Sequence, residues 1–194
     1  LILVGVFFPP ILGWLNLRVN YRNHRKIVVI DGNVGFVGGF NIGREYISKD
    51  PGFGYWRDTH LRITGEAVMS LQIRFALDWN YATGENLFKN EAYFRTDLKK
   101  KTDVRRDKER PAWPDPELEG SQVGMQIIAS GPDTREPHIR NNYLELFHKA
   151  KHHIYIQTPY FVPDDAIFSA LKMAALSGVD VRLMIPCKPD HPFV

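Results

Sequence analysis

The chain has 194 residues, of which 44% are hydrophobic and 24% are charged, and its formal net charge is +3. This length is sufficient for one domain with a hydrophobic core or for parts of two, and the composition excludes a chain that is disordered throughout. The mildly basic balance suits an anionic partner, either a phospholipid headgroup or a nucleic acid, without selecting one. Cys187 is the only cysteine, which excludes an internal disulfide and a cysteine-rich zinc site. We expect its thiol to be a small buried hydrophobic group.

The apolar segment at residues 1–8 is interrupted by Pro9 and Pro10. It is too short to span a bilayer, which takes about 20 apolar residues, and it lacks the basic leader and cleavage site of a signal peptide. We expect a buried strand followed by a loop. Because no initiator methionine is present, we also expect the sequence to begin and end within a longer protein.

The next apolar run predicts a β-hairpin. Ile27–Ile30 is a β-branched strand, and residues 31–33 (Asp-Gly-Asn) supply turn chemistry. Residues 34–37 form the second strand, and Gly38-Gly39 opens a turn in which backbones can approach closely.

A third strand and a helix follow. Residues 58–64 alternate between polar and apolar side chains, as in a strand with one buried face. Apolar residues recur at helical spacing between residues 66 and 81, which predicts a helix that packs on the sheet. These apolar positions are Val68, Leu71, Phe75 and Trp79.

The composition changes between about residues 89 and 120. Basic residues crowd positions 99–108 and prolines follow at 111, 114 and 116, which indicates a linker or a long surface loop. The basic residues are either part of a solvated linker or a patch that contacts anionic lipid.

Alternating strands and helices return after residue 121. We expect strands at 123–129, 154–157 and 179–185, and helices at 141–151 and from Asp164-Asp165 to about Leu176, with Gly178 as the stop. This order implies an α/β fold with a largely parallel sheet covered by helices. Gln157–Pro163 is either a loop that lines a lipid entrance, with Tyr160 and Phe161 exposed, or a packed corner between strand and helix.

The chemistry is concentrated around the hairpin. Strand alternation places the side chains of His24 and Lys26 on one face. An imidazole beside an ammonium suits a phosphate diester, because His can attack phosphorus and Lys can hold the developing negative charge. Asn41, beyond the Gly-Gly turn, can donate an amide hydrogen to a phosphoryl oxygen.

The same alternation points Asp31 away from His24, so we expect Asp31 to stabilise the turn. The carboxylate that orients the His24 ring should then come from elsewhere, because an activated His usually has a partner on its other nitrogen. Our candidate is Asp58, at the entrance of the third strand.

These residues resemble the signature of the phospholipase D superfamily, His-x-Lys-x4-Asp-x6-Gly-(Ser or Gly)-x-Asn. His24, Lys26, Asp31, Gly38-Gly39 and Asn41 stand at the matching positions. The resemblance implies an active site in which two such motifs meet, a phosphohistidine on one His, a leaving alcohol protonated by the other, and no metal or cofactor. It makes His24, Lys26 and Asp31 catalytic candidates, with Asp58 added by our hypothesis, and it places Asn41 and Gly39 at the substrate phosphate.

The chain resembles the bacterial cardiolipin synthase branch along its whole length. The matching segments are residues 22–26, 38–42, 55–60 and 157–163. The resemblance implies an enzyme of phospholipid biosynthesis that transfers a phosphatidyl group between two phosphatidylglycerol molecules, giving cardiolipin and glycerol. It implies phosphatidylglycerol and a membrane surface as partners, the bacterial cytoplasmic membrane as location, and no nucleic acid.

The sequence departs from the superfamily pattern because it contains no second His-x-Lys-x4-Asp. We therefore expect a first phospholipase-D-like half at residues 1–97, a basic, proline-rich linker at 98–120, and the start of a second half at 121–194 whose motif lies beyond Val194. The alternatives are another reaction of the superfamily, either lipid hydrolysis or nuclease action, and a fragment that binds anionic lipid without catalysis.

Overall fold

The computed structural model describes residues 2–7, 23–52, 54–94, 123–131 and 133–187. The chain divides into two compact units, Leu1–Ile127 and Ile128–Val194. Each unit combines a small sheet with helices, so the predicted α/β class is confirmed. The predicted linker at 98–120 lies outside the described residues.

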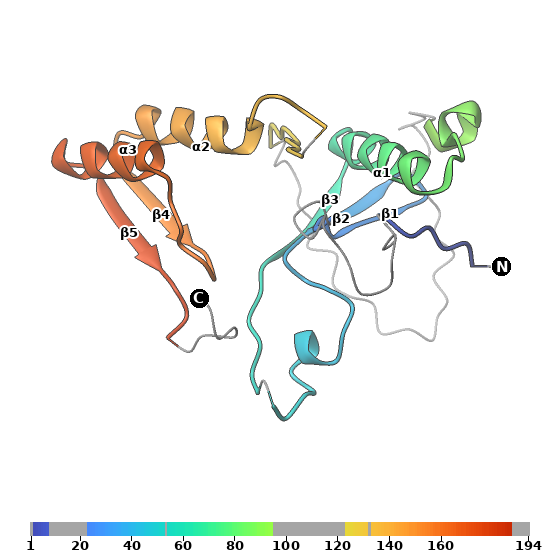
Figure 1. The fold of residues 1–194 in the computed structure, drawn as a ribbon, viewed down its shortest axis with the longest axis horizontal. Coiled ribbons are helices and arrows are strands. Elements are labelled where there is room, and N and C mark those ends of the chain that lie inside the picture. The colour runs from blue at the N-terminus through green and yellow to red at the C-terminus, as the bar shows by residue number, and fades with distance from the viewer. Residues whose placement is uncertain (1, 8–22, 53, 95–122, 132, 188–194) are drawn as a thin grey trace, which may run out of the picture. The chain divides into compact units, whose positions relative to one another are not determined.

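The first unit is built on a three-stranded antiparallel sheet in the order β1-β2-β3 (Figure 1). Its strands are β1 (Ile27–Ile30), β2 (Val34–Gly38) and β3 (His60–Thr64). The predicted hairpin is therefore confirmed. Its turn contains Asp31 and Gly32 at φ values of 53° and 67°, as in the mirror-image turns that match the twist of paired strands.

One face of this sheet is covered by helix α1 (Ala67–Thr83). Ile63, Val68 and Leu71 form the buried core between them. Inward-facing residues of the first two strands, Ile27, Val29 and Val37, pack around this core. The alternation read from the sequence thus corresponds to one covered face and one open face.

The prediction that Phe75 belongs to this packed face is wrong, because its side chain is 45% exposed. Strands of four or five residues extend about 13–17 Å, whereas the 17-residue α1 extends about 25 Å. The C-terminal part of α1 therefore runs past the strands. There Phe75 stacks on Trp79, with ring centroids 5.9 Å apart.

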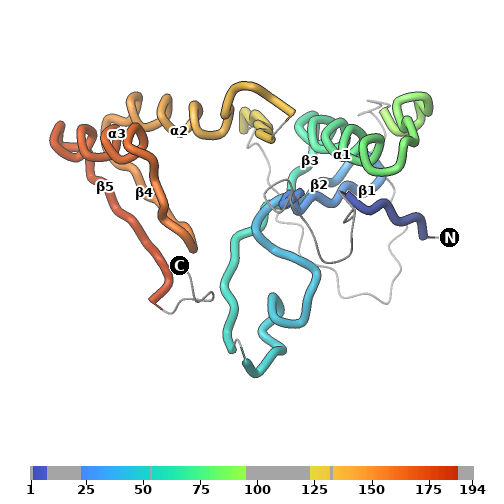
Figure 2. The backbone as a smooth tube through the Cα atoms, viewed as in Figure 1, coloured from blue at the N-terminus to red at the C-terminus, as the bar shows by residue number. Residues whose placement is uncertain are grey.

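The connection from β2 to β3 is a long excursion away from the sheet (Figure 2). It contains one short 3-10 turn, Glu45–Ile47. Tyr46 in this turn meets Trp56 edge to face at 4.9 Å, and Ser48 Oγ accepts a hydrogen bond from Trp56 N at 2.9 Å. Two further 3-10 turns, Leu87–Lys89 and Glu91–Phe94, follow α1.

The prediction of a buried strand at the start of the chain is wrong. Residues 2–7 pair with no strand of the described residues, and Ile2 and Val4 are 90% and 79% exposed. A strand requires a partner for its backbone groups, which an apolar sequence does not by itself provide.

The second unit alternates helix and strand. Its elements are α2 (His138–Lys149), β4 (His153–Gln157), α3 (Asp165–Leu176) and β5 (Asp180–Met184). Strands β4 and β5 are parallel, as predicted. The core gathers residues from all these elements or their ends: Phe147, Ile154, Ala170, Leu171, Ala174 and Val179.

Two sequence-based expectations for this half fail. Residues 123–129 are not a strand, because they pair with no other described segment, and Ile127 instead packs against the core of the first unit. Cys187 is exposed rather than buried, since it lies beyond the end of β5. The predicted helix stop is confirmed, with Gly178 at a φ of 90°.

Candidate active site

The side chains of His24 and Lys26 lie together just before β1. Lys26 Nζ is 2.8 Å from His24 Nδ1 and 3.3 Å from His24 Nε2, and it donates to the His24 carbonyl oxygen at 2.8 Å. A lysine ammonium can only donate, so the imidazole nitrogen that faces it acts as an acceptor. The His24 side chain is solvent-exposed and that of Lys26 is partly buried.

This pair belongs to the open face of the sheet. The β1 residues that face α1 are Ile27 and Val29, whereas Val28 and Ile30 are 46% and 49% exposed. Side chains two residues apart on an extended chain share a face, so His24 and Lys26 lie on the side of Val28 and Ile30. A substrate can therefore approach the pair without displacing α1.

The backbone of the pair is tied to α1 by Asp78. Its carboxylate accepts from Asn23 Nδ2 at 2.9 Å and from Arg25 Nη1 at 3.1 and 3.3 Å. Asn23 and Arg25 flank His24, so these bonds fix the segment from the covered side. Sequence reasoning missed Asp78. The signal was its helical spacing, seven residues after the buried Leu71, which places a carboxylate on the face that covers the sheet.

Asp58 lies beside the glycine turn and in the field of Lys26. A Cβ on Gly39 would come within 2.8 Å of Asp58 Oδ2, so the absence of a side chain at Gly39 makes room for this carboxylate. Burial lowers the pKa of Lys26 below its ordinary value, and the negative charge of Asp58 opposes that decrease. The predicted contact between Asp58 and the His24 ring stays a prediction.

The Asn41 side chain is held by the β2–β3 connection. Asn41 Nδ2 donates to the Tyr46 hydroxyl at 2.6 Å, and the Tyr46 ring also contacts those of Phe40 and Trp56. An amide carries two N–H bonds, so one contact with Tyr46 does not use both. Tyr46 is a second residue that the motif analysis missed, because its role depends on how the loop folds back.

Asp31 lies at the other end of β1 from His24 and Lys26. Asp31 is five residues beyond Lys26 and seven beyond His24, which corresponds to about 16 Å and about 23 Å along an extended chain at 3.3 Å per residue. The left-handed backbone of Asp31 agrees with a role in the turn. The geometry thus brings His24 close to Lys26, with Asp58 within electrostatic reach, and leaves Asp31 apart.

Comparison with known proteins places these features in a family. The family described as "Cardiolipin synthase, PLD-like domain" matches residues 143–194. A Staphylococcus aureus protein named cardiolipin synthase is 52% identical over 189 residues, covering 97% of this chain and 34% of that protein. A cardiolipin synthase of Oceanobacillus iheyensis is 47% identical over 193 residues, covering 100% of this chain and 36% of the relative.

This chain belongs to the cardiolipin synthase family of phospholipase-D-like proteins. A third relative, cardiolipin synthase 2 of Staphylococcus epidermidis, is 52% identical over 189 residues, covering 97% of this chain and 35% of the relative. The chain thus spans about a third of the length of the curated relatives it matches. No solved structure matches it significantly.

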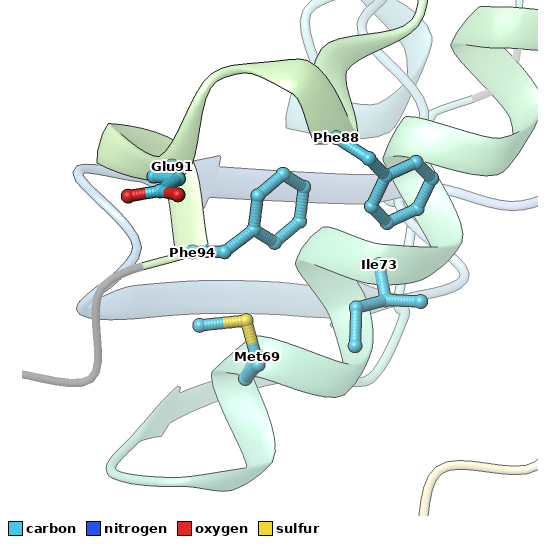
Figure 3. Close-up of a pocket in the computed structure, with 5 residues that line it drawn as sticks. All are labelled: Met69, Ile73, Phe88, Glu91 and Phe94. Atoms are coloured by element: carbon cyan, nitrogen blue, oxygen red, sulfur yellow. The ribbon is translucent and has the colours of Figure 1, made fainter.

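A cavity in the described residues of the chain lies apart from the candidate site. It has a volume of about 540 Å³ and lies between α1 and the 3-10 turns that follow it (Figure 3). Its lining residues are Met69, Ile73, Phe88, Glu91 and Phe94, none of which is a predicted site residue. Among the residues that the structure describes, no group of three or more His, Cys, Asp or Glu side chains is arranged to hold a metal.

The Gln157–Pro163 segment combines both alternatives considered for it. Tyr160 is 45% exposed and Val162 is 85% exposed, whereas Phe161 packs against the core of the second unit. The exposure that the lipid-entrance alternative requires is therefore seen for Tyr160 but not for Phe161. In the described parts of the chain, no helix has the length and apolarity needed to cross a bilayer.

Proposed function

We propose that this chain supplies one half of the active site of an enzyme that transfers a phosphatidyl group between two phosphatidylglycerol molecules. The observation that carries the proposal is the 2.8 Å contact between Lys26 Nζ and the His24 ring on the open face of the sheet. The similarity to proteins named cardiolipin synthase supports the choice of reaction.

The reaction proceeds by two displacements at phosphorus. In the first, an imidazole nitrogen forms a bond to the phosphorus of one phosphatidylglycerol while the bond to its glycerol oxygen breaks, and a second His donates a proton to that glycerol. In the second, a hydroxyl of another phosphatidylglycerol gives its proton back to that His and attacks the phosphohistidine. Cardiolipin and free imidazole result, and atoms balance without a cofactor.

Residues of this chain have distinct roles in that scheme. His24 is either the nucleophile or the acid–base residue. The Lys26 ammonium and an Asn41 N–H stabilise the charge that develops on the phosphoryl oxygens, and Gly39 lies at the phosphate, as the motif implies. Burial lowers the pKa of Lys26, and the negative charge of Asp58 opposes that decrease and so favours the charged ammonium.

The other His requires a second motif. We propose that residues 1–97 form the first phospholipase-D-like half, that 98–120 link it to the start of the second half at 121–194, and that the second motif follows Val194. In the full-length protein the two motifs meet at the cytoplasmic membrane of a bacterium, where the substrate lies. No nucleic acid takes part.

Product analysis tests this proposal. The full-length protein, incubated with phosphatidylglycerol vesicles, should release cardiolipin and glycerol in equal amounts, and His24→Ala should abolish both. Phosphatidic acid as the main product would show that the reaction is hydrolysis and not transfer. Cleavage of nucleic acid in place of lipid would overturn the proposed substrate class. Vesicle binding without turnover would favour a lipid-binding protein.

A further inference from the structure

A second imidazole of the first unit shares the open face with His24 and Lys26. His60, the first residue of β3, pairs directly with Gly38 of β2. The β1–β2 register pairs Ile27 with Val37, so extending it by one residue sets Lys26 opposite Gly38. Lys26, Gly38 and His60 thus form one row across three strands, and paired residues of neighbouring strands point to the same face.

Gly38 makes room for the His60 ring. A Cβ at this position would lie 2.7 Å from His60 Nδ1 and 2.5 Å from the Thr59 carbonyl oxygen. Both separations are shorter than van der Waals contact, so any side chain at Gly38 would displace the ring. The ring also meets Phe40 edge to face, with centroids 6.2 Å apart, and lies 6.5 Å from the ring of Phe36.

The ring is aimed at the backbone of the glycine turn. Phe40 N donates a hydrogen bond to His60 Nδ1 at 3.4 Å. Phe40 stands between Gly39 and Asn41, the two residues assigned to the substrate phosphate. The bond requires that Nδ1 carry no proton, so the neutral ring keeps its hydrogen on Nε2.

From this geometry, and resting on the proposed function, we propose that His60 is a positioning residue that holds the Gly38–Asn41 turn in its phosphate-binding conformation through the Phe40 amide. His60 itself does not contact the reacting phosphorus. It acts by fixing the direction of the backbone that carries Asn41 toward the open face.

Three substitutions separate this role from a direct one. The side-chain oxygen of Asn occupies about the position of His Nδ1, whereas the amide of Gln reaches the position of Nε2. In the full-length protein, His60→Ala and His60→Gln should lower kcat/KM by about 10- to 100-fold, and His60→Asn should stay within about threefold of the unsubstituted enzyme. Retained activity in His60→Gln but not in His60→Asn would overturn the proposal, as would three variants that behave alike.

Hydrogen exchange of the Phe40 amide provides a readout besides activity. Its protection should fall in His60→Ala and return in His60→Asn, with melting temperatures measured to exclude global unfolding. If the unsubstituted protein makes no cardiolipin yet shows this pattern, the proposed function fails while the contact stands. If it makes cardiolipin and Phe40 protection is the same in all variants, the inference about His60 alone fails.

Discussion

The two units differ in the groups that contact their histidine rings. In the first unit, His24 faces the ammonium of Lys26 at 2.8 Å. In the second unit, His148 Nδ1 lies 2.6 Å from the Leu144 carbonyl oxygen of its own helix, and the His153 ring stacks on Tyr155 at 4.7 Å. The described part of the second unit has more histidines than that of the first. The contacts of each imidazole, rather than the number of histidines in a unit, therefore distinguish His24 from the histidines of the second unit.

The carboxylates differ in the same way. Asp78 of the first unit joins α1 to the segment that carries His24, and the Arg25–Asp78 ion pair is only 25% and 19% exposed. Asp180 of the second unit pairs with Arg182 and accepts from the Tyr155 hydroxyl, all at the surface. The first arrangement holds the segment that carries His24 and Lys26 against α1, whereas the second joins β4 to β5 at the surface.

The largest difference between the units is expected when one imidazole is removed from each, in separate variants. In the full-length protein, His24→Ala should lower kcat by at least about 100-fold, because it removes the proposed nucleophile or acid–base group. His148→Ala should keep activity within about twofold, as expected for a surface substitution. Cardiolipin formation at saturating phosphatidylglycerol measures both. Equal losses in the two variants would break the comparison.

The two carboxylates should give a smaller contrast. Asp78→Ala removes bonds to Asn23 and Arg25 and should reduce the free energy of unfolding by about 1–3 kcal/mol. It should also lower kcat/KM by about 10-fold through movement of His24. Asp180→Ala is the matched control and should leave kcat/KM unchanged. Denaturant unfolding and initial rates measure these effects, and an Asp78→Ala enzyme with normal kcat/KM would show that the anchor does not serve the site.

Asp58→Asn should change the pH dependence of the first unit. Burial lowers the pKa of Lys26 from 10.5, and Asp58 opposes this. Loss of the carboxylate should therefore lower that pKa further and move the basic limb of the kcat/KM profile to lower pH. At pH values between the lowered pKa of Lys26 in the folded chain and its ordinary value of 10.5, the unfolded chain binds more protons than the folded chain. The contribution of Lys26 to the free energy of unfolding therefore rises with pH in this range.

Asp50→Asn, in the same β2–β3 connection, is the control for this profile, because Asp50 caps only its local turn through Gly52 N. If the basic limb of the pH profile does not move in Asp58→Asn, Asp58 does not influence the pKa of Lys26. A limb that moves equally in both variants would assign the effect to the loop as a whole.

The smallest effect is expected in the second unit, at the start of α3. Asp164 accepts from Ile167 N at 2.9 Å and pairs with Arg140, and the Arg140 hydrogen bond lowers the pKa of Asp164 below 3.8. Its contribution to stability is present above pH 3.8 and is lost as the pH falls through the lowered pKa. Asp164→Asn should reduce the fall of the melting temperature at acid pH without changing catalysis. An unchanged acid profile would contradict the pairing.

Local signals in the sequence were sufficient for part of this structure. The hairpin followed from its β-branched strands and turn residues, and the proximity of His24 and Lys26 followed from strand alternation. The start of α3 followed from its Asp cap. Each of these depends on residues close together in the sequence, where backbone geometry alone determines the outcome.

Features that depend on distant partners could not be predicted in this way. Asp78 is 53 residues from Arg25, and the His60 ring lies over Gly38 only because β3 pairs with β2. Residues 123–129 have the composition of a strand but no strand beside them among the described residues. The motif residues are recognised from short spacings in the sequence, whereas Asp78 comes close to Arg25, and His60 close to Gly38, only after folding.

A structure of the full-length protein with inorganic vanadate, a mimic of phosphate at the transition state, tests the central claim most directly. The account predicts vanadate on the open face of the sheet, within hydrogen-bond distance of a His24 ring nitrogen and of Lys26 Nζ, and no vanadate there in Lys26→Ala. Vanadate bound elsewhere, or bound equally well in Lys26→Ala, would contradict the assignment of this pair to the phosphate.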